Sequence, residues 1–343
     1  GYTYTIEARL SNAEDHSRMD RTSTSQGVAL KLKDISKAIG DLKRLPDFPK
    51  GVSDDQDFLM TSAPIFFLDN IVQYAAAFGF RANVENPKLP QKVKFIATHP
   101  YLIPRSKEES SAARRATDET EEGRPESFLS HPYWSKHPYA WGERPVDGQV
   151  SGPKQYPVKY SVEPCEADIA LSKKQKEEAK ASDKNYQVKY LTQALDTNKK
   201  ICFYFRVQTR PGSDVSPVLK EQQYPVENGH KEWDAVRVPF ERIAKIEFSL
   251  DNEVNKNWLR IASQFVNDMK AAEAAGKEFK PTQEFVDMQA KCGATEFTPW
   301  NGLMAHQPLS NLARGRRDVY KASALMRTIK PELDERISKL RAK

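Results

Sequence analysis

Three residues near the C-terminus combine one phenol with two guanidinium groups at helical spacing. Arg316, Tyr320 and Arg327 are four and then seven positions apart, which places them within roughly 40° of one another on a helix that turns about 100° per residue. A cation one turn before a phenol favours the phenolate, and a phenolate oxygen is a ligand for ferric iron. The same spacing also fits a surface helix with one buried tyrosine and two solvated arginines.

The residues before this motif predict where its helix begins. Pro308 is followed by Ser310 and Asn311, which are both good N-cap residues, and the next proline is Pro331. Because proline and the cap residues mark a helix boundary, we expect a helix over residues 312–328.

The wider run resembles the proximal haem motif of the catalase superfamily, in particular that of its small, divergent members. R-x-x-x-Y-x6-R is accompanied by F-x-P-W, H-x-P-L and R-x-x-V-Y-x-x-S patterns between residues 297 and 327. The resemblance implies haem b as the cofactor, with Tyr320 as the axial ligand of its iron. It also implies that Arg316 bonds the tyrosine oxygen and that Arg327 meets a haem propionate.

Three upstream patterns follow the order found in the same family. They are R-x-S at residues 9–11, G-x-A-x-K at residues 27–31 and A-P-I-F-F at residues 63–67. By this resemblance Arg9 is a second propionate-binding arginine. The alternative is that Arg9 is an edge-strand arginine that faces water.

The distal side of the implied haem site departs from the family pattern. Thr61 stands where the family has an asparagine, and Tyr74 falls where a phenylalanine is common. Phe67, in the A-P-I-F-F pattern, is a further candidate contact of the haem. The acid–base histidine of the family would lie upstream of Gly1, so we expect the native chain to extend in that direction.

Together these residues imply a haem-dependent oxidoreductase of the catalase or peroxidase type. It would act on hydrogen peroxide or a related reduced oxygen species, with Tyr320, Arg316 and Thr61 as the candidate catalytic residues. Two alternatives stay open because the distal side differs. One is a haem enzyme with little catalase activity that acts on an organic substrate, like the lipid hydroperoxide isomerases or the chanoclavine-synthase type of oxidative cyclase. The other is a haem-free scaffold or interaction protein.

The patterns of the remaining chain predict the elements that position these residues. Alternating or apolar stretches predict strands at residues 2–10, 27–32, 57–68, 156–163, 201–209, 235–240 and 243–250. Helical periodicity predicts a helix at 69–80, another at 254–269 and a third that ends near Cys292. With the resemblance, these elements predict an α+β fold, namely a catalase-like antiparallel β-barrel whose C-terminal helices carry the axial ligand.

We expect the chain to divide into two regions. Residues 1–251 would form the barrel, and residues 252–343 a helical region that includes the haem helix. Residues 105–126 contain almost no large apolar side chains, so this stretch is expected to be a flexible surface insertion.

Composition indicates the class of protein and its partners. A net charge of +6, spread along 343 residues, does not indicate a nucleic-acid binder. No apolar run approaches the roughly 18 residues of a membrane span. The three cysteines are far apart, which favours reduced thiols in an intracellular protein, cytoplasmic or peroxisomal.

His131 and His137 have no further ligand residues near them that would complete a metal site, so they are interpreted as ordinary loop histidines. The resemblance adds a homodimer or homotetramer as the expected assembly.

Overall fold

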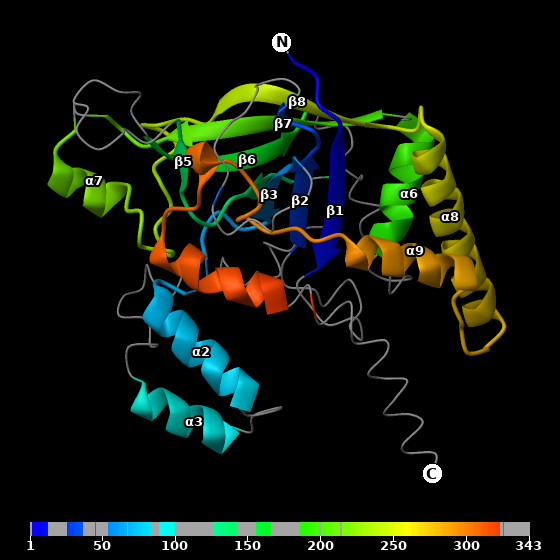
Figure 1. Cartoon of the computed structure of the whole chain (residues 1–343). Helices are drawn as coiled ribbons and strands as arrows, with labels where there is room; N and C mark the ends of the chain where they lie inside the picture. Colours follow the sequence, from blue (N-terminus) through cyan, green and yellow to red (C-terminus); the bar gives the residue numbers. More distant parts are fainter. Residues whose placement is uncertain are drawn as a thin grey trace.

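The strands of the chain form one antiparallel sheet, and the helices lie beneath it and at one end (Figure 1). The computed structural model describes residues 2–12, 26–36, 45, 54–66, 68–83, 89–99, 127–129, 131–142, 156–165, 186–198, 200–212, 215–322 and 325. Within these ranges, no helix combines the length and the apolar character that a membrane span requires.

The sheet has eight strands in the order β1-β2-β3-β4-β6-β7-β8, with β5 paired to β6. The strands are β1 Ile6–Asn12, β2 Gln26–Leu32, β3 Gln56–Thr61, β4 Tyr133–Trp134, β5 Tyr139–Trp141, β6 Tyr156–Pro164, β7 Lys200–Thr209 and β8 Glu241–Ser249. In the described part of the chain β1 and β8 end this order without pairing to each other. The predicted antiparallel architecture is therefore confirmed, but as an open half-barrel.

One face of the half-barrel carries the apolar core. Strand side chains alternate between the two faces, and those on this face come from nearly every strand. Phe58 of β3 lies at their centre, where its ring meets Tyr160 edge-on at 5.1 Å and Phe205 at 5.0 Å. Leu195 and Leu259, from helices at the end of the sheet, complete the cluster. Burial of these rings and aliphatic side chains supplies the main driving force for folding.

Helices extend this core at its end and beneath the sheet. They are α2 Ile71–Asn83, α3 Leu89–Thr98, α6 Tyr186–Asn198, α7 Pro217–Gln223, α8 Glu253–Ala274 and α9 Gln283–Ala294, with a 3₁₀ turn, η5, at Met304–His306. The predicted pair of helices after residue 252 corresponds to α8 and α9, which pack together through Phe265 and Phe285 at 3.9 Å. A further helix covers residues 311–322.

One predicted strand is wrong. Residues 235–240 form turns, and the edge strand β8 begins only at Glu241. The cause is local, because the Asp234 carboxylate accepts hydrogen bonds from the backbone N–H groups of Val236 and Arg237. Such a turn competes with an extended conformation. The predicted insertion at 105–126 lies outside the described residues.

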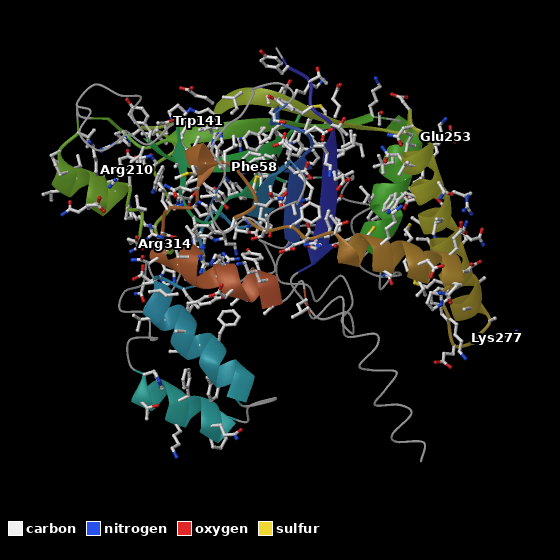
Figure 2. The ribbon with its side chains drawn as sticks, in the orientation of Figure 1. Phe58, Trp141, Arg210, Glu253, Lys277 and Arg314 are labelled. Carbon is white, nitrogen blue, oxygen red and sulfur yellow. A yellow bond between two sulfur atoms is a disulfide. The ribbon has the colours of Figure 1, made fainter. Side chains whose placement is uncertain are left out.

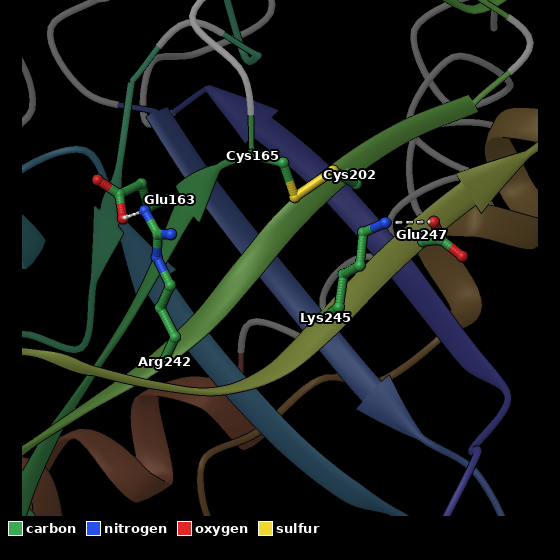
Figure 3. The surroundings of a disulfide bond; sticks show 6 residues. All are labelled: Glu163, Cys165, Cys202, Arg242, Lys245 and Glu247. Carbon is green, nitrogen blue, oxygen red and sulfur yellow. Dashed lines mark hydrogen bonds and ion pairs between the residues drawn. A yellow bond between two sulfur atoms is a disulfide. The ribbon is translucent and has the colours of Figure 1, made fainter.

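The prediction of three reduced thiols is also corrected. Cys165 and Cys202 form a disulfide with their Cα atoms 5.5 Å apart (Figure 3). Cys292 is free and exposed. The antiparallel pairing of β6 and β7 aligns Pro164 with Phe203 and so brings the two cysteines together. A separation of 37 residues along the chain hides this cross-strand proximity in the sequence.

Candidate functional site

The outer face of β3 forms one wall of the candidate site. Phe58 and Met60 belong to the core, so the alternation of the strand places Leu59 and Thr61 on the opposite face. Thr61 donates its hydroxyl hydrogen to the backbone oxygen of Ala63 at 3.3 Å. The side chain of Thr61 therefore keeps only acceptor capacity for anything that binds beside it.

A buried ion pair fixes the chain segment that leads to the C-terminal helix. Asp57 is fully buried, receives a hydrogen bond from Lys31 Nζ at 2.7 Å and accepts the backbone N–H of Thr298 at 3.0 Å. Burial raises the pKa of Asp57 to about 6, although the charge of Lys31 acts in the opposite direction. The backbone adds a further bond from Asp57 N to the oxygen of Asn301 at 2.9 Å. Residues 298–301 are thereby held against β3.

The helix over residues 311–322 begins where its cap residues predict. Ser310 Oγ accepts the backbone N–H of Ala313 at 3.0 Å, as an N-cap side chain does. The carboxylate of Glu227 accepts the N–H of Asn311 at 2.8 Å. Leu312, only 1% exposed, packs against Phe66 and other apolar side chains on the far side of the helix from solvent. Figure 2 shows Arg314 on this helix beneath the sheet that contains Phe58.

Arg316 links Tyr320 to a buried histidine. Its Nη2 donates to the Tyr320 hydroxyl at 2.5 Å, and its Nη1 lies 2.9 Å from His137 Nε2. Because a guanidinium has only donors, His137 Nε2 must accept, which assigns a neutral imidazole with its hydrogen on Nδ1. Burial and the charges of Arg316, Lys159 and Lys136 hold the pKa of His137 well below its usual range. The neutral form is therefore favoured electrostatically as well as by geometry.

Tyr320 opens onto a cleft between this helix and β3. The enclosed part of the cleft measures about 30 Å³, and its lining residues are Leu59, Thr61, Lys136, His137, Tyr139, Pro299, Ala313, Arg316 and Tyr320. Leu59, Pro299 and Ala313 make apolar walls, whereas Lys136 and Arg316 bring positive charge. None of the lining residues is a carboxylate. The cleft therefore suits a largely apolar ligand that carries negative charge.

The structure brings three of the predicted site residues together and separates two others. Tyr320, Arg316 and Thr61 all line the cleft. Tyr74 does not line the cleft, but it is buried against Phe66 and Phe78, with 4.4 Å between its ring centroid and that of Phe78, and burial raises its pKa. Arg9 does not line the cleft. Arg327 and Phe67 lie outside the described residues.

Arg9 nevertheless lies on the face of the sheet that contains the cleft. The strand register aligns Arg9 with Ala29 and Ala29 with Leu59, so the three side chains share one side. The guanidinium of Arg9 stacks on Phe297 at 4.6 Å and donates to the backbone oxygen of Thr295 at 3.3 Å. This arginine contacts the segment that precedes the C-terminal helix, so the predicted edge-strand position is right but exposure to water is only partial.

Sequence reasoning missed His137 as a partner of Arg316. The two residues are 179 positions apart, and His137 stands in an aromatic loop with no metal-ligand pattern around it. No local signal in the sequence distinguishes it from His131, six residues earlier. Within the part of the chain that the structure describes, no cluster of three histidine, cysteine or acidic residues could hold a metal ion.

Comparison with solved structures identifies the fold. The chain superposes on catalase A from Saccharomyces cerevisiae with a TM-score of 0.59 and 14% identity, covering 94% of this chain and 53% of that one. A fungal catalase gives a TM-score of 0.54 at 13% identity, with 94% and 53% covered. A bacterial catalase gives 0.57 at 13% identity, with 94% and 50% covered. No protein-family model and no curated protein matches the sequence.

These likenesses show that the chain has a catalase-like fold. At 13–14% identity they show the fold alone. The chain spans about half the length of each catalase chain that it matches.

Proposed function

We propose that the chain is a haem-dependent oxidoreductase of the catalase type and that Tyr320 is the axial ligand of the haem iron. The observation that carries this proposal is the bond from Arg316 to the Tyr320 hydroxyl at the edge of the cleft. A guanidinium in that position can donate a hydrogen bond to the tyrosine oxygen when that oxygen binds ferric iron. The catalase-like fold supports the same assignment at the level of the whole chain.

The residues of the cleft fit haem b better than they fit a bare metal ion. A bare metal ion needs several protein ligands. The iron of haem is already bound by the four porphyrin nitrogens and needs only one axial ligand from the protein. Tyr320 supplies one such oxygen. Apolar walls from Leu59, Pro299 and Ala313 suit the porphyrin, and the cations at the cleft suit its carboxylate groups. Arg9 and Arg327 stay predictions as propionate ligands.

The side chains of this site have distinct roles in the proposed reaction. When bound, haem supplies a ferric iron that exchanges electrons with peroxides. Arg316 donates a hydrogen bond to the oxygen of Tyr320 and would hold that oxygen in place for the iron. His137 accepts the second N–H of Arg316 and so fixes the orientation of the guanidinium plane. Leu59 and the other apolar walls limit the water that reaches the cleft.

An organic substrate is the second candidate, and the hydrogen bond of Thr61 favours it. Catalase chemistry moves a proton between the two oxygens of peroxide. Thr61 already donates its only proton to Ala63, so it offers an acceptor but no proton at that position. The reaction of an organic hydroperoxide or of a reducing organic co-substrate needs a proton donor at this position less than the dismutation of hydrogen peroxide does.

Haem reconstitution followed by absorption spectroscopy tests the proposal. The purified protein should give a high-spin ferric Soret band that changes in Tyr320→Phe and persists in the control Tyr156→Phe, which alters a strand residue away from the cleft. If the protein stays colourless after incubation with excess haem and removal of the unbound haem, the haem-free scaffold would be the better interpretation. Oxygen evolution from hydrogen peroxide then separates catalase activity from turnover of an organic hydroperoxide.

A further inference from the structure

The segment over residues 224–238, here named the brace, connects the sheet, the start of α2 and the start of the C-terminal helix. It follows α7 and runs back towards the first turn of the helix over residues 311–322 (Figure 1). No sequence pattern marked it as part of the site. Its hydrogen bonds to three separate parts of the fold suggest a mechanical role.

Buried side chains of the sheet anchor the brace. Gln208 of β7 donates through Nε2 to the backbone oxygens of Trp233 at 3.3 Å and Val238 at 2.8 Å. Lys159 of β6 donates through Nζ to the backbone oxygen of Lys231 at 3.1 Å. Gln208 and the Trp233 side chain are each only 1% exposed. The bonds from Gln208 are thus shielded from competition by water.

The brace also forms backbone hydrogen bonds with the residues that precede α2. Gly229 O accepts the backbone N–H of Phe66 at 2.9 Å, and Gly229 N donates to the oxygen of Asp69 at 2.7 Å. This close approach requires glycine, because a Cβ at position 229 would lie 2.4 Å from the backbone oxygen of Leu68. Backbone atoms cannot swing aside as a side-chain end can, so even alanine must force the two segments apart.

The third contact is with the helix that carries Tyr320. The exposed carboxylate of Glu227 accepts the backbone N–H of Asn311 at 2.8 Å, at the end of the helix where a negative charge is favourable. A Cβ at position 229 would also lie 3.4 Å from Leu312 Cδ2, in ordinary contact with this buried leucine. These contacts therefore limit how far the helix over residues 311–322 can shift along its own axis and how closely it can pack against the brace.

A short path of contacts leads from the brace to the proposed iron ligand. Gly229 fixes the backbone of Phe66, and the ring of Phe66 faces the guanidinium of Arg316 at 4.8 Å. Arg316 in turn bonds the Tyr320 hydroxyl. We infer that Gly229 and Glu227 are positioning residues that place Arg316 and Tyr320 against the cleft. This inference rests on the proposed function for its haem readout, but the placement itself can be measured without haem.

Gly229→Ala tests the inference, with Gly79→Ala as the matched control. Gly79 lies on α2, and a Cβ there would meet nothing within 4 Å. In the haem-free protein, Gly229→Ala should speed amide hydrogen exchange of residues 311–322 at least tenfold and leave β6 and β7 unchanged, whereas Gly79→Ala should change neither. In the haem-loaded protein it should weaken haem binding by roughly 10- to 100-fold and alter the Soret band, because small misplacements of a ligand are costly.

Glu227→Ala and Glu227→Gln give a second test that does not endanger folding, because Glu227 is exposed. Glutamine keeps an acceptor oxygen for Asn311 N, so it should restore most of the exchange protection that alanine loses. A general loss of stability would raise exchange across the whole chain and would overturn the inference. Unchanged exchange in residues 311–322 for both Gly229→Ala and Glu227→Ala would overturn it as well. If the wild-type protein binds no haem, the proposed function fails while the exchange experiment still decides the role of the brace.

Discussion

At the scale of single residues, the candidate site depends on the two directions in which one guanidinium donates. Arg316 reaches Tyr320 through Nη2 and His137 through Nη1. An ammonium group is a single point of charge and cannot reproduce this planar fork. The two hydrogen bonds therefore require arginine at this position, and lysine, although it has the same charge, cannot make both.

Arg316→Lys should weaken haem binding by roughly 10- to 100-fold, which corresponds to the loss of one charge-assisted hydrogen bond. The substitution keeps the positive charge, so the loss would report the hydrogen-bond geometry. Transfer of haem to a scavenger protein measures the effect as a faster dissociation rate. Arg314→Lys is the control, because Arg314 lies on the same helix, its side chain bonds Asn311 and it does not line the cleft. Equal rates in the two variants would argue against a role for Arg316.

His131 provides a prediction about pH, since both of its ring nitrogens are buried beside Tyr133. Burial lowers the pKa of His131 from 6.5 to about 4. Between pH 6.5 and pH 4, His131 is protonated in the unfolded chain but largely neutral in the folded chain. The free energy of unfolding therefore falls as the pH drops towards 4. The loss over that window is roughly 3 kcal/mol, at 1.36 kcal/mol per pH unit.

His131→Phe keeps an aromatic ring but removes the titration. The difference in free energy of unfolding between the variant and the wild type should therefore shift in favour of the variant by that amount between pH 6.5 and pH 4. Urea unfolding across this range measures it. The raised pKa of Asp57 acts in the opposite direction, with stability lost as pH rises from 3.8 to about 6, but it is common to both proteins and cancels. A constant difference across the range would contradict the prediction.

The residues that sequence reasoning found are those whose partners are close along the chain. Arg316 and Tyr320 are four positions apart, so helical periodicity alone predicts their contact. His137 reaches the same guanidinium from 179 positions away, and only the folded sheet brings it there. Arg9 was predicted from a family resemblance to bind a haem propionate, and its bond to Thr295 depends on a segment 286 positions away, which the sequence did not reveal.

At the scale of elements, the link between β3 and the segment before the C-terminal helix includes a close approach of Gly302 to Gln56. Gln56 Oε1 accepts the N–H of Leu303 at 2.9 Å, and its Nε2 donates to the backbone oxygen of Asp57 at 3.1 Å. Gly302 lies directly beside this side chain, because a Cβ at position 302 would fall 2.3 Å from Gln56 Oε1. Any side chain there must push Gln56 out of its two bonds.

Gly302→Ala should therefore destabilise the protein by roughly 1–3 kcal/mol, which is the usual cost of leaving buried polar groups without partners. Chemical denaturation measures the change in free energy of unfolding. Gly79→Ala is the control, and it should be neutral or stabilising by up to about 1 kcal/mol, because alanine favours an exposed helix. A Gly302→Ala variant as stable as the control would show that Gln56 moves aside freely.

Elements with strong local signals were predicted, and those defined by tertiary contacts were not. The start of the helix at residue 311 follows from the cap residue Ser310, whose hydrogen bond is local. Helices α3 and α6 were missed, although Leu89, Val93 and Ile96 of α3 lie at helical spacing, as do Leu191 and Leu195 of α6. The two-residue strand β4 exists only through its pairing with β3 and β6, so no period in the sequence could reveal it.

At the scale of the whole molecule, the cleft lies between two parts that are far apart along the chain. Thr61 and Leu59 belong to the sheet, whereas Tyr320 and Arg316 belong to a helix that begins at residue 311. The antiparallel architecture was predictable because short patterns along the chain resemble those of catalases in the same sequential order. The open half-barrel was not, because closure of a sheet depends on pairing between its first and last strands.

A ligand that binds across this cleft should stabilise the whole fold. Haemin at a hundred times its dissociation constant should contribute about 2.7 kcal/mol, which raises Tm by roughly 4 °C in a protein of this size. Iron-free protoporphyrin has the same apolar body and carboxylates but cannot bond Tyr320, so it should stabilise less. Tyr320→Phe should remove the difference between the two porphyrins and keep their common effect. Equal stabilisation of the wild-type protein by both porphyrins would separate porphyrin binding from iron ligation and exclude Tyr320 as the axial ligand.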